Sequence, residues 1–140
     1  TGFESDSQNF LYTLHYVLHE LKWPIEYYKH VITPLPFAEI EERPDQEVLK
    51  AIRQSLANLE INGPNTVIAV LPDGRMLTCC DSKKLRPVVV GGDDTTIAIS
   101  SEVCGLNEIL PHRDMTKDIY PNERDVVVIG NDLEVQRWKQ

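Results

Sequence analysis

The residue best suited to ligand chemistry lies near the start of the chain. Asp6 stands in the segment Ser5-Asp6-Ser7, directly before a run of apolar residues at helical spacing. A carboxylate in the first turn of a helix accepts backbone N–H bonds and complements the helix dipole, so the simplest interpretation is a helix cap. The same carboxylate could hold an ammonium group of a ligand through a charge-assisted hydrogen bond. Asp6 is therefore the first candidate binding residue, with the cap as the alternative.

Two linked segments in the second half of the chain carry the other candidates. The first has the pattern D-x-x-x-L-R-P, in which Asp81 and Arg86 lie across one loop. An ion pair between them could fix the turn between two strands. The second segment contains Ser-Ser-Glu, in which Ser101 and Glu102 are placed to cap a short helix and add charge to its first turn. A catalytic serine would need a base in reach, and nothing nearby in the sequence supplies one for Ser101. All four residues are therefore predicted to be structural.

Cysteine is a natural nucleophile and metal ligand, and the chain has three of them: Cys79, Cys80 and Cys104. Adjacent cysteines very rarely pair with each other, so no disulfide framework is expected, and a reducing compartment follows. A Cys-Cys pair followed by a distant single cysteine lacks the spacing of a zinc site. We therefore expect buried, unreactive thiols.

Two further alternatives involve histidine and the first residue. His15 and His19 are four residues apart on one helical face, so a metal pair is formally conceivable, but their neighbours supply no clear third ligand. Thr1 could act as both nucleophile and general base if it were an exposed N-terminal residue. Such a nucleophile should begin a buried strand, whereas Thr1 leads directly into a helix. We assign no metal, cofactor or catalytic residue.

The first 63 residues carry helical patterns. Apolar residues recur at helical spacing from Phe10 to Leu21, and a shorter helical stretch follows Pro24. The segment 33–36 contains two prolines and should be extended. A second strong helix follows Pro44. Its inner face is predicted to consist of Val48, Leu49, Ile52, Leu56 and Leu59.

From residue 64 onward the hydrophobic period is that of strands, with turn residues between them. Three hairpins are predicted, with turns at 72–74, 92–94 and 130–132. Their strands are expected at 66–71 and 75–79, 88–91 and 95–100, and 125–129 and 133–137. The strands at 66–71 and 126–129 are apolar on consecutive residues, so both of their faces should be covered. A short helix is expected between the second and third hairpins.

Composition limits the classes of partner. The chain has 140 residues, a formal net charge of −8 and a pI near 4.9, with acidic residues spread along it. Nucleic acids and anionic membranes attract clustered lysine and arginine, so neither is an expected partner. No apolar run approaches the roughly 20 residues of a membrane span, and the start of the chain is not a cationic signal peptide. We expect a cytoplasmic protein that forms one domain.

The motifs occur in an order that resembles the C-terminal half of the glutaminase domain of class II glutamine amidotransferases, most closely that of glutamate synthase. The resemblance rests on Ser5-Asp6-Ser7, Asn62-Gly63-Pro64, the D-x-x-x-L-R-P segment and Ser-Ser-Glu. It spans nearly the whole chain, although each motif is short. It implies an α+β fold, a layered α/β/β/α sandwich of antiparallel sheets flanked by helices, of the N-terminal nucleophile amidohydrolase type and only partly present. It also implies that Asp6 holds the α-amino group of glutamine.

Catalysis in this family needs an N-terminal cysteine, an arginine for the glutamine carboxylate and an Asn-Gly oxyanion element, all preceding the helix that carries Asp6. None of the three has a counterpart in this sequence. Residues 1–140 are thus expected to be the C-terminal portion of such a domain, helical over 1–63 and β-rich over 64–140, and inactive alone because the donors that stabilise the intermediate are missing.

The resemblance leaves two interpretations of the chain. In the first it binds L-glutamine, completes a glutaminase together with a nucleophile-bearing segment, and supplies ammonia to a synthase partner that would carry any cofactor. In the second it is a catalytically silent module for assembly or regulation. An exposed apolar sheet edge would favour the first interpretation, and a fully covered sheet the second.

Overall fold

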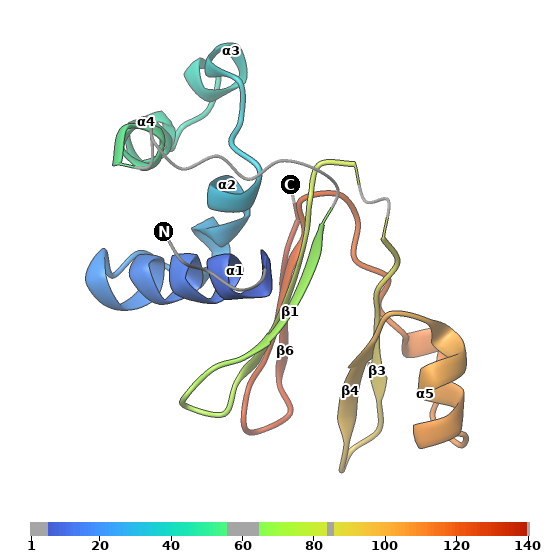
Figure 1. The fold of residues 1–140 in the computed structure, drawn as a ribbon. Coiled ribbons are helices and arrows are strands. Elements are labelled where there is room, and N and C mark those ends of the chain that lie inside the picture. Colours follow the sequence, from blue (N-terminus) through green and yellow to red (C-terminus); the bar gives the residue numbers. More distant parts are fainter. Residues whose placement is uncertain (1–5, 56–64, 84–85, 140) are drawn as a thin grey trace. The chain divides into compact units, whose positions relative to one another are not determined.

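The computed structural model describes residues 6–55, 65–83 and 86–139, and it divides into two compact units (Figure 1). The first unit is Thr1–Gly63 and the second is Pro64–Gln140. The boundary falls where the sequence pattern changes from helical to strand-like. Helices and antiparallel sheets together give the α+β composition that the sequence predicted.

The described part of the first unit is helical. It contains α1 (Asp6–His15), the π-helical turn η1 (Tyr16–Glu20), the 3-10 turn η2 (Ile25–Tyr27), α2 (Tyr28–Ile32), α3 (Phe37–Glu41) and α4 (Gln46–Ser55). On the apolar face of α1 and η1, Leu14 and Val17 are buried. The hydroxyl of Tyr28 donates to the carbonyl of Phe10 at 3.0 Å and ties α2 to α1. These contacts confirm the helix predicted over this stretch and the shorter one after Pro24.

Two details of the helical unit differ from expectation. The helix α3 was not predicted, because it has only five residues, which is too short a stretch to show a helical period, and of these only Ile40 is buried. In α4, Leu49 and Ile52 are buried as predicted, but Val48 is 39% exposed. The inner face is therefore narrower than the run of apolar residues, and Leu56 and Leu59 lie outside the described residues.

All three predicted hairpins are present in the second unit. The strands are β1 (Thr66–Val70), β2 (Met76–Cys80), β3 (Val89–Gly92), β4 (Ile97–Ser100), β5 (Val126–Ile129) and β6 (Val135–Trp138). The strands β1, β2, β5 and β6 form an antiparallel sheet in that order, and β3 and β4 form a second, two-stranded sheet. The helix α5 (Val103–Ile109) and the 3-10 turn η3 (Met115–Lys117) lie between β4 and β5 in the chain.

The two sheets of this unit pack face to face through an apolar core. Val127 and Ile129 of β5 are buried against Val90 of β3, and Ile97 and Ile99 of β4 pack against the same cluster. On the other face of the β3–β4 sheet lies α5, whose Leu106 is fully buried (Figure 1). The second unit therefore has three layers, two of β-sheet and one helical.

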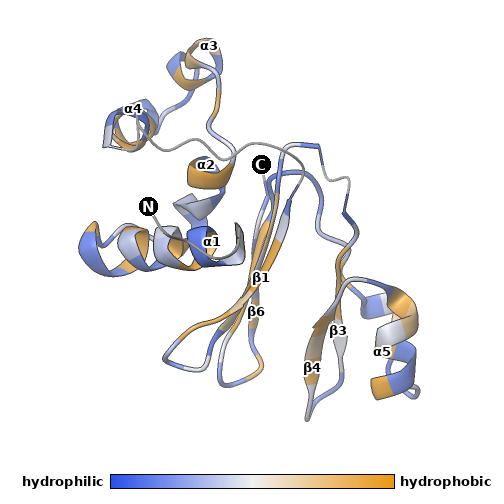
Figure 2. Cartoon of the chain, in the orientation of Figure 1, coloured by the Kyte–Doolittle hydropathy of each residue, from blue (hydrophilic) through white to orange (hydrophobic). Residues whose placement is uncertain are grey.

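The prediction that both faces of the strand are covered is confirmed for β5 and is wrong for β1. Every residue of β5 is buried, with at most 3% exposed. In β1, by contrast, Ile68 is 47% and Val70 is 67% exposed. Figure 2 shows β1 as a hydrophobic strand, so its composition alone does not reveal that it lies at the edge of its sheet. Consecutive apolar residues predicted burial that this position does not provide.

Candidate functional site

Asp81, the acidic residue of the D-x-x-x-L-R-P segment, is a buried structural hub. It follows β2 and is 4% exposed. Its Oδ2 accepts a hydrogen bond from the backbone N–H of Asn65 at 3.1 Å, and its own N–H donates to the Asn65 carbonyl at the same distance. Its carbonyl accepts the N–H of Arg124 at 3.1 Å. Asp81 thus fastens the start of β1 and the segment before β5 to the end of β2.

Arg86, at the other end of the same segment, is exposed. Its backbone carbonyl accepts the hydroxyl of Thr66 at 3.1 Å. Among the ion pairs of the described residues, none contains Arg86. Thr66 therefore ties Arg86 to the start of β1, and the ion pair with Asp81 that the spacing suggested does not form.

The Ser-Ser-Glu motif leads from β4 into α5, but the predicted cap is shifted by one residue. The residue before the helix is Glu102, in an extended conformation and with no side-chain cap bond, and Ser101 is exposed. The hydroxyl of Ser100 donates to the carbonyl of Glu102 at 2.8 Å and accepts its N–H at 3.3 Å. Ser100, still inside β4, therefore makes the local turn that was assigned to Ser101, while Glu102 accepts a bond from the Cys104 thiol at 3.3 Å.

Asp6 is the first described residue of α1, and its side chain lies outside the described part of the structure. It belongs to the first unit, whereas Asp81, Arg86, Ser101 and Glu102 belong to the second. Within the second unit, Asp81 is bonded to Asn65, Arg86 to Thr66 at the start of β1, and the Ser-Ser-Glu motif within itself.

The cysteines divide into two kinds. Cys79 and Cys80 of β2 are fully buried, as expected, but Cys104 of α5 is exposed, which corrects the expectation for that thiol.

The rings of His15 and His19 lie 4.7 Å apart between centroids. No group of three potential metal ligands exists among the residues that the structure describes.

A buried ion pair between Arg113 and Asp118 was not predicted from the sequence. Nε of Arg113 donates to Oδ1 of Asp118 at 2.9 Å, and Nη2 donates to Oδ2 at 2.7 Å. Nη1 donates to Oδ1 of Asn107 at 3.0 Å and to the Leu110 carbonyl at 3.1 Å. The hydrogen bonds that Arg113 donates to Asp118 raise the pKa of Arg113 above its ordinary value. The only sequence signal was a pair of opposite charges five residues apart in a stretch without periodicity.

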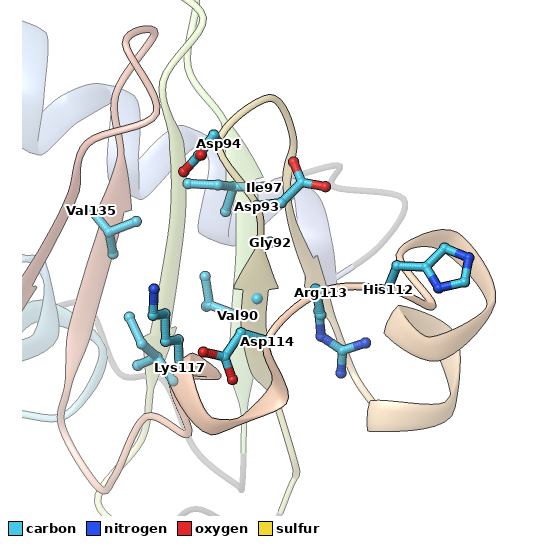
Figure 3. A pocket seen from close by; sticks show the side chains of 12 residues that line it. Val90, Gly92, Asp93, Asp94, Ile97, His112, Arg113, Asp114, Lys117 and Val135 are labelled. Carbon is cyan, nitrogen blue, oxygen red and sulfur yellow. The ribbon is translucent and has the colours of Figure 1, made fainter.

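This ion pair supports one wall of a cavity in the second unit (Figure 3). The cavity has a volume of about 320 Å³. The β3–β4 hairpin, the segment around η3 and β6 surround it. Its lining consists of Val90, Gly91, Gly92, Asp93, Asp94, Ile97, His112, Arg113, Asp114, Lys117, Ile119 and Val135. Figure 3 shows Asp94 and Lys117 on different walls of this hollow.

Two carboxylates at the cavity are held ionised by local hydrogen bonds. Oδ1 of Asp93 accepts the backbone N–H groups of Thr95 and Thr96 and the Thr95 hydroxyl, each at 2.9 Å, and these bonds lower the pKa of Asp93. Oδ1 of Asp114 accepts the hydroxyl of Thr116 at 2.6 Å and its N–H at 3.1 Å, which lowers the pKa of Asp114. Both side chains are therefore anionic at neutral pH.

Along the described residues, no helix combines the length and the apolar character that crossing a membrane requires. No protein-family model matches the chain, and neither a curated protein nor a solved structure is similar enough to it to count as a match.

Proposed function

We propose that this chain is the C-terminal portion of a class II glutamine amidotransferase domain that binds L-glutamine and supplies ammonia for glutamate synthesis. The nucleophile-bearing segment and the synthase are separate parts in this proposal, and any cofactor belongs to the synthase. Such a role in nitrogen assimilation fits a cytoplasmic location. The alternative is a catalytically silent module of the same family that serves assembly or regulation.

The observation that carries the proposal is the order of motifs and elements in the second unit. The segment after β2 begins with Asp81 and runs through Arg86-Pro87, and β3 begins two residues after Pro87. The hairpin β3–β4 then ends in Ser-Ser-Glu at the start of α5. The order of the D-x-x-x-L-R-P segment, strand, turn, strand and Ser-Ser-Glu is the one on which the resemblance to the glutaminase domain rests.

The layers of the second unit support the proposed fold type. An N-terminal nucleophile amidohydrolase would have two antiparallel sheets packed together with helices outside them. The second unit contains two sheets packed face to face and one helix on the outer face of the smaller sheet. These layers are compatible with three of the four that the proposed α/β/β/α sandwich requires.

The edge of the larger sheet favours the enzymatic interpretation over the silent one. By register, Ile68 pairs with Thr78 and Thr78 with Val127, while Val70 pairs with Met76 and Met76 with Ile129. Ile68 and Val70 thus share the face that packs on the β3–β4 sheet, yet both are largely exposed.

An apolar inner face wider than the sheet that covers it is a typical docking surface for further strands. The missing nucleophile segment is the partner that the proposal implies for this face.

In the proposed reaction this chain contributes binding rather than bond breaking. The carboxylate of Asp6 would accept hydrogen bonds from the α-ammonium group of glutamine and thereby fix the position of its side-chain amide. The nucleophile, the donors for the oxyanion and the partner for the glutamine carboxylate would come from the nucleophile-bearing segment. Asp81 would act only by holding the loop between β2 and β3.

Titration calorimetry with L-glutamine tests the proposal, with L-glutamate as the control ligand. Wild-type protein should bind glutamine in preference to glutamate, and Asp6→Ala should weaken that binding by about tenfold or more, because a charge-assisted bond is lost. Glu20→Ala, which removes an exposed carboxylate from the same unit, is the matched control. Equal glutamine binding by both variants would remove Asp6 from the site, and no binding by any of the three proteins would favour the silent module.

A further inference from the structure

The cavity beside the β3–β4 hairpin has the features of a preformed small-molecule site. Two backbone hydrogen bonds join Val90 and Ile119 across one wall, at 2.9 Å and 2.7 Å. The Arg113 to Asp118 ion pair, whose side chains are 0% and 1% exposed, anchors the neighbouring segment. A cavity whose walls are fixed in this way loses little conformational freedom when a ligand enters.

The floor of the cavity is aliphatic. It is formed by Val90, which is buried, and by Ile97, Ile119 and Val135, which pack against the same core cluster. Gly91 and Gly92 add backbone without side chains to the lining. A volume of about 320 Å³ is at the lower end of the range for ligand sites, so the cavity suits one small molecule with an apolar body.

The rim carries two side chains of opposite charge that form no ion pair within the described residues. The side chains of Asp94, beside the β3–β4 turn, and Lys117, at the end of η3, take part in no hydrogen bond or ion pair within the described residues. The charge of Lys117 acts on the Asp114 carboxylate without forming an ion pair with it. Figure 3 shows the Lys117 amine extending into the space below Asp94. Arg113 cannot serve as a second free cation, because all of its nitrogens are engaged by Asp118, Asn107 and Leu110.

A ligand that satisfies both rim charges must carry both signs. We propose that this cavity binds a small zwitterion with an aliphatic body, namely an α-amino acid of about the size of leucine. Its ammonium group would lie at Asp94 and its carboxylate at Lys117. Its side chain would cover Ile97, Ile119 and Val135. This site uses none of the residues proposed for glutamine and stands independently of the proposed function.

The probe is L-leucine, titrated calorimetrically into the full 140-residue chain. Two analogues separate the charges: 3-methylbutylamine lacks the carboxylate and 4-methylpentanoate lacks the ammonium group. Leucine should bind saturably with a Kd in roughly the micromolar to millimolar range, and each analogue should bind about tenfold more weakly or worse. Amide resonances of Gly92, Asp94 and Lys117 should shift in the nuclear magnetic resonance spectrum during the same titration.

Variants complete the test. Lys117→Met and Asp94→Asn should each weaken leucine binding about tenfold, whereas Lys83→Met, an exposed lysine of the same unit away from the cavity, should not. All three side chains are exposed, so the variants should keep the wild-type thermal transition. Tighter binding of the amine than of leucine would show a cation site instead. That result would overturn the proposal. The proposal would also be overturned if Lys117→Met bound leucine as tightly as wild type, or if leucine showed no saturable binding up to about 10 mM.

Discussion

Arg113 donates two hydrogen bonds to the carboxylate of Asp118, 2.9 Å and 2.7 Å long, inside the second unit, where both side chains are buried. The same guanidinium bonds Asn107 of α5 and the Leu110 carbonyl. One side chain therefore fastens the helix, the segment after it and the turn that carries Lys117. The position of the cavity wall depends on this ion pair.

Removing one partner of the pair should destabilise the protein far more than removing a partner of an exposed pair. Asp118→Asn leaves the buried guanidinium without a counter-charge, and we expect the urea midpoint to fall by about 1 M or more. Asp73→Asn is the control, because Asp73 and Arg75 form an ion pair that is 53% and 38% exposed. Its midpoint should change by less than half as much, and similar shifts for both variants would contradict the structural role of the buried pair.

Gly91→Ala should also destabilise the second unit, since the ion pair lies directly against that glycine. A Cβ at this position would overlap Oδ1 of Asp118 and would lie 3.0 Å from Cδ1 of Leu106 and 3.1 Å from Nε of Arg113. These atoms are buried and bonded, so they cannot move aside cheaply. Thermal unfolding should show a loss of roughly 1–3 kcal/mol, the usual cost of overpacking. An unchanged melting temperature would mean that the pair is less rigid than described.

Local patterns predicted the three hairpins and the main helices well, because turn residues and apolar spacing indicate such elements within a few residues. The turns at Gly74 and Gly130 separate apolar runs, and Gly74 has the positive φ, 92°, that this turn needs. Exposure of Ile68 and Val70 could not be predicted in the same way, since it depends on which strand lies at the sheet edge. Edge position follows from the pairing of β2 with β5, which are separated by more than forty residues in sequence.

Thr78→Val should stabilise the protein. Thr78 lies in the middle of β2 and is 0% exposed, and its Oγ1 has no hydrogen-bond partner in the part of the chain that the structure describes. Replacing a buried, unsatisfied hydroxyl by a methyl group of similar size removes a desolvation cost, and we expect a gain of about 1 kcal/mol in the free energy of unfolding. Thr78→Ser is the companion variant, because it keeps the hydroxyl and loses the methyl group, and it should lower stability. A loss with valine would indicate that the hydroxyl has a partner.

The turn between β3 and β4 should make stability depend on acid pH through Asp93. The backbone N–H of Thr95, together with the Thr95 hydroxyl and the Thr96 N–H, lowers the pKa of Asp93 below its ordinary 3.8. A carboxyl whose pKa is lowered by folding contributes stability that is complete above 3.8 and is lost as the pH falls through the lowered value.

Urea midpoints measured across this range should separate wild type from Asp93→Asn. The difference between the two proteins should be largest above about pH 5 and should narrow below about pH 3. Asp94→Asn is the neighbouring control, since Asp94 accepts no hydrogen bond within the described residues. A difference for Asp93→Asn that stays constant with pH would contradict the assignment.

The candidate sites were visible in the sequence to different degrees. Asp6 and Asp81 stand in short motifs that a resemblance can pick out, although only the structure shows that Asp81 bonds Asn65 and Arg124. Lys117 and Asp94 carry no motif. Their relation arises from the bridge between Val90 and Ile119, which sets the segment around η3 beside the hairpin. Pairing between segments of this kind leaves no periodic signal in the chain.

A nuclear magnetic resonance titration of the isotope-labelled chain with L-glutamine tests whether Asp6 binds this ligand. If Asp6 anchors the α-ammonium group, the amides of Ser7 and Gln8 at the start of α1 should shift saturably, and Asp6→Ala should abolish those shifts. L-glutamate should produce smaller shifts at the same amides. Shifts confined to the cavity residues, or none at the start of α1, would contradict the account of this chain as the glutamine-binding portion of an amidotransferase.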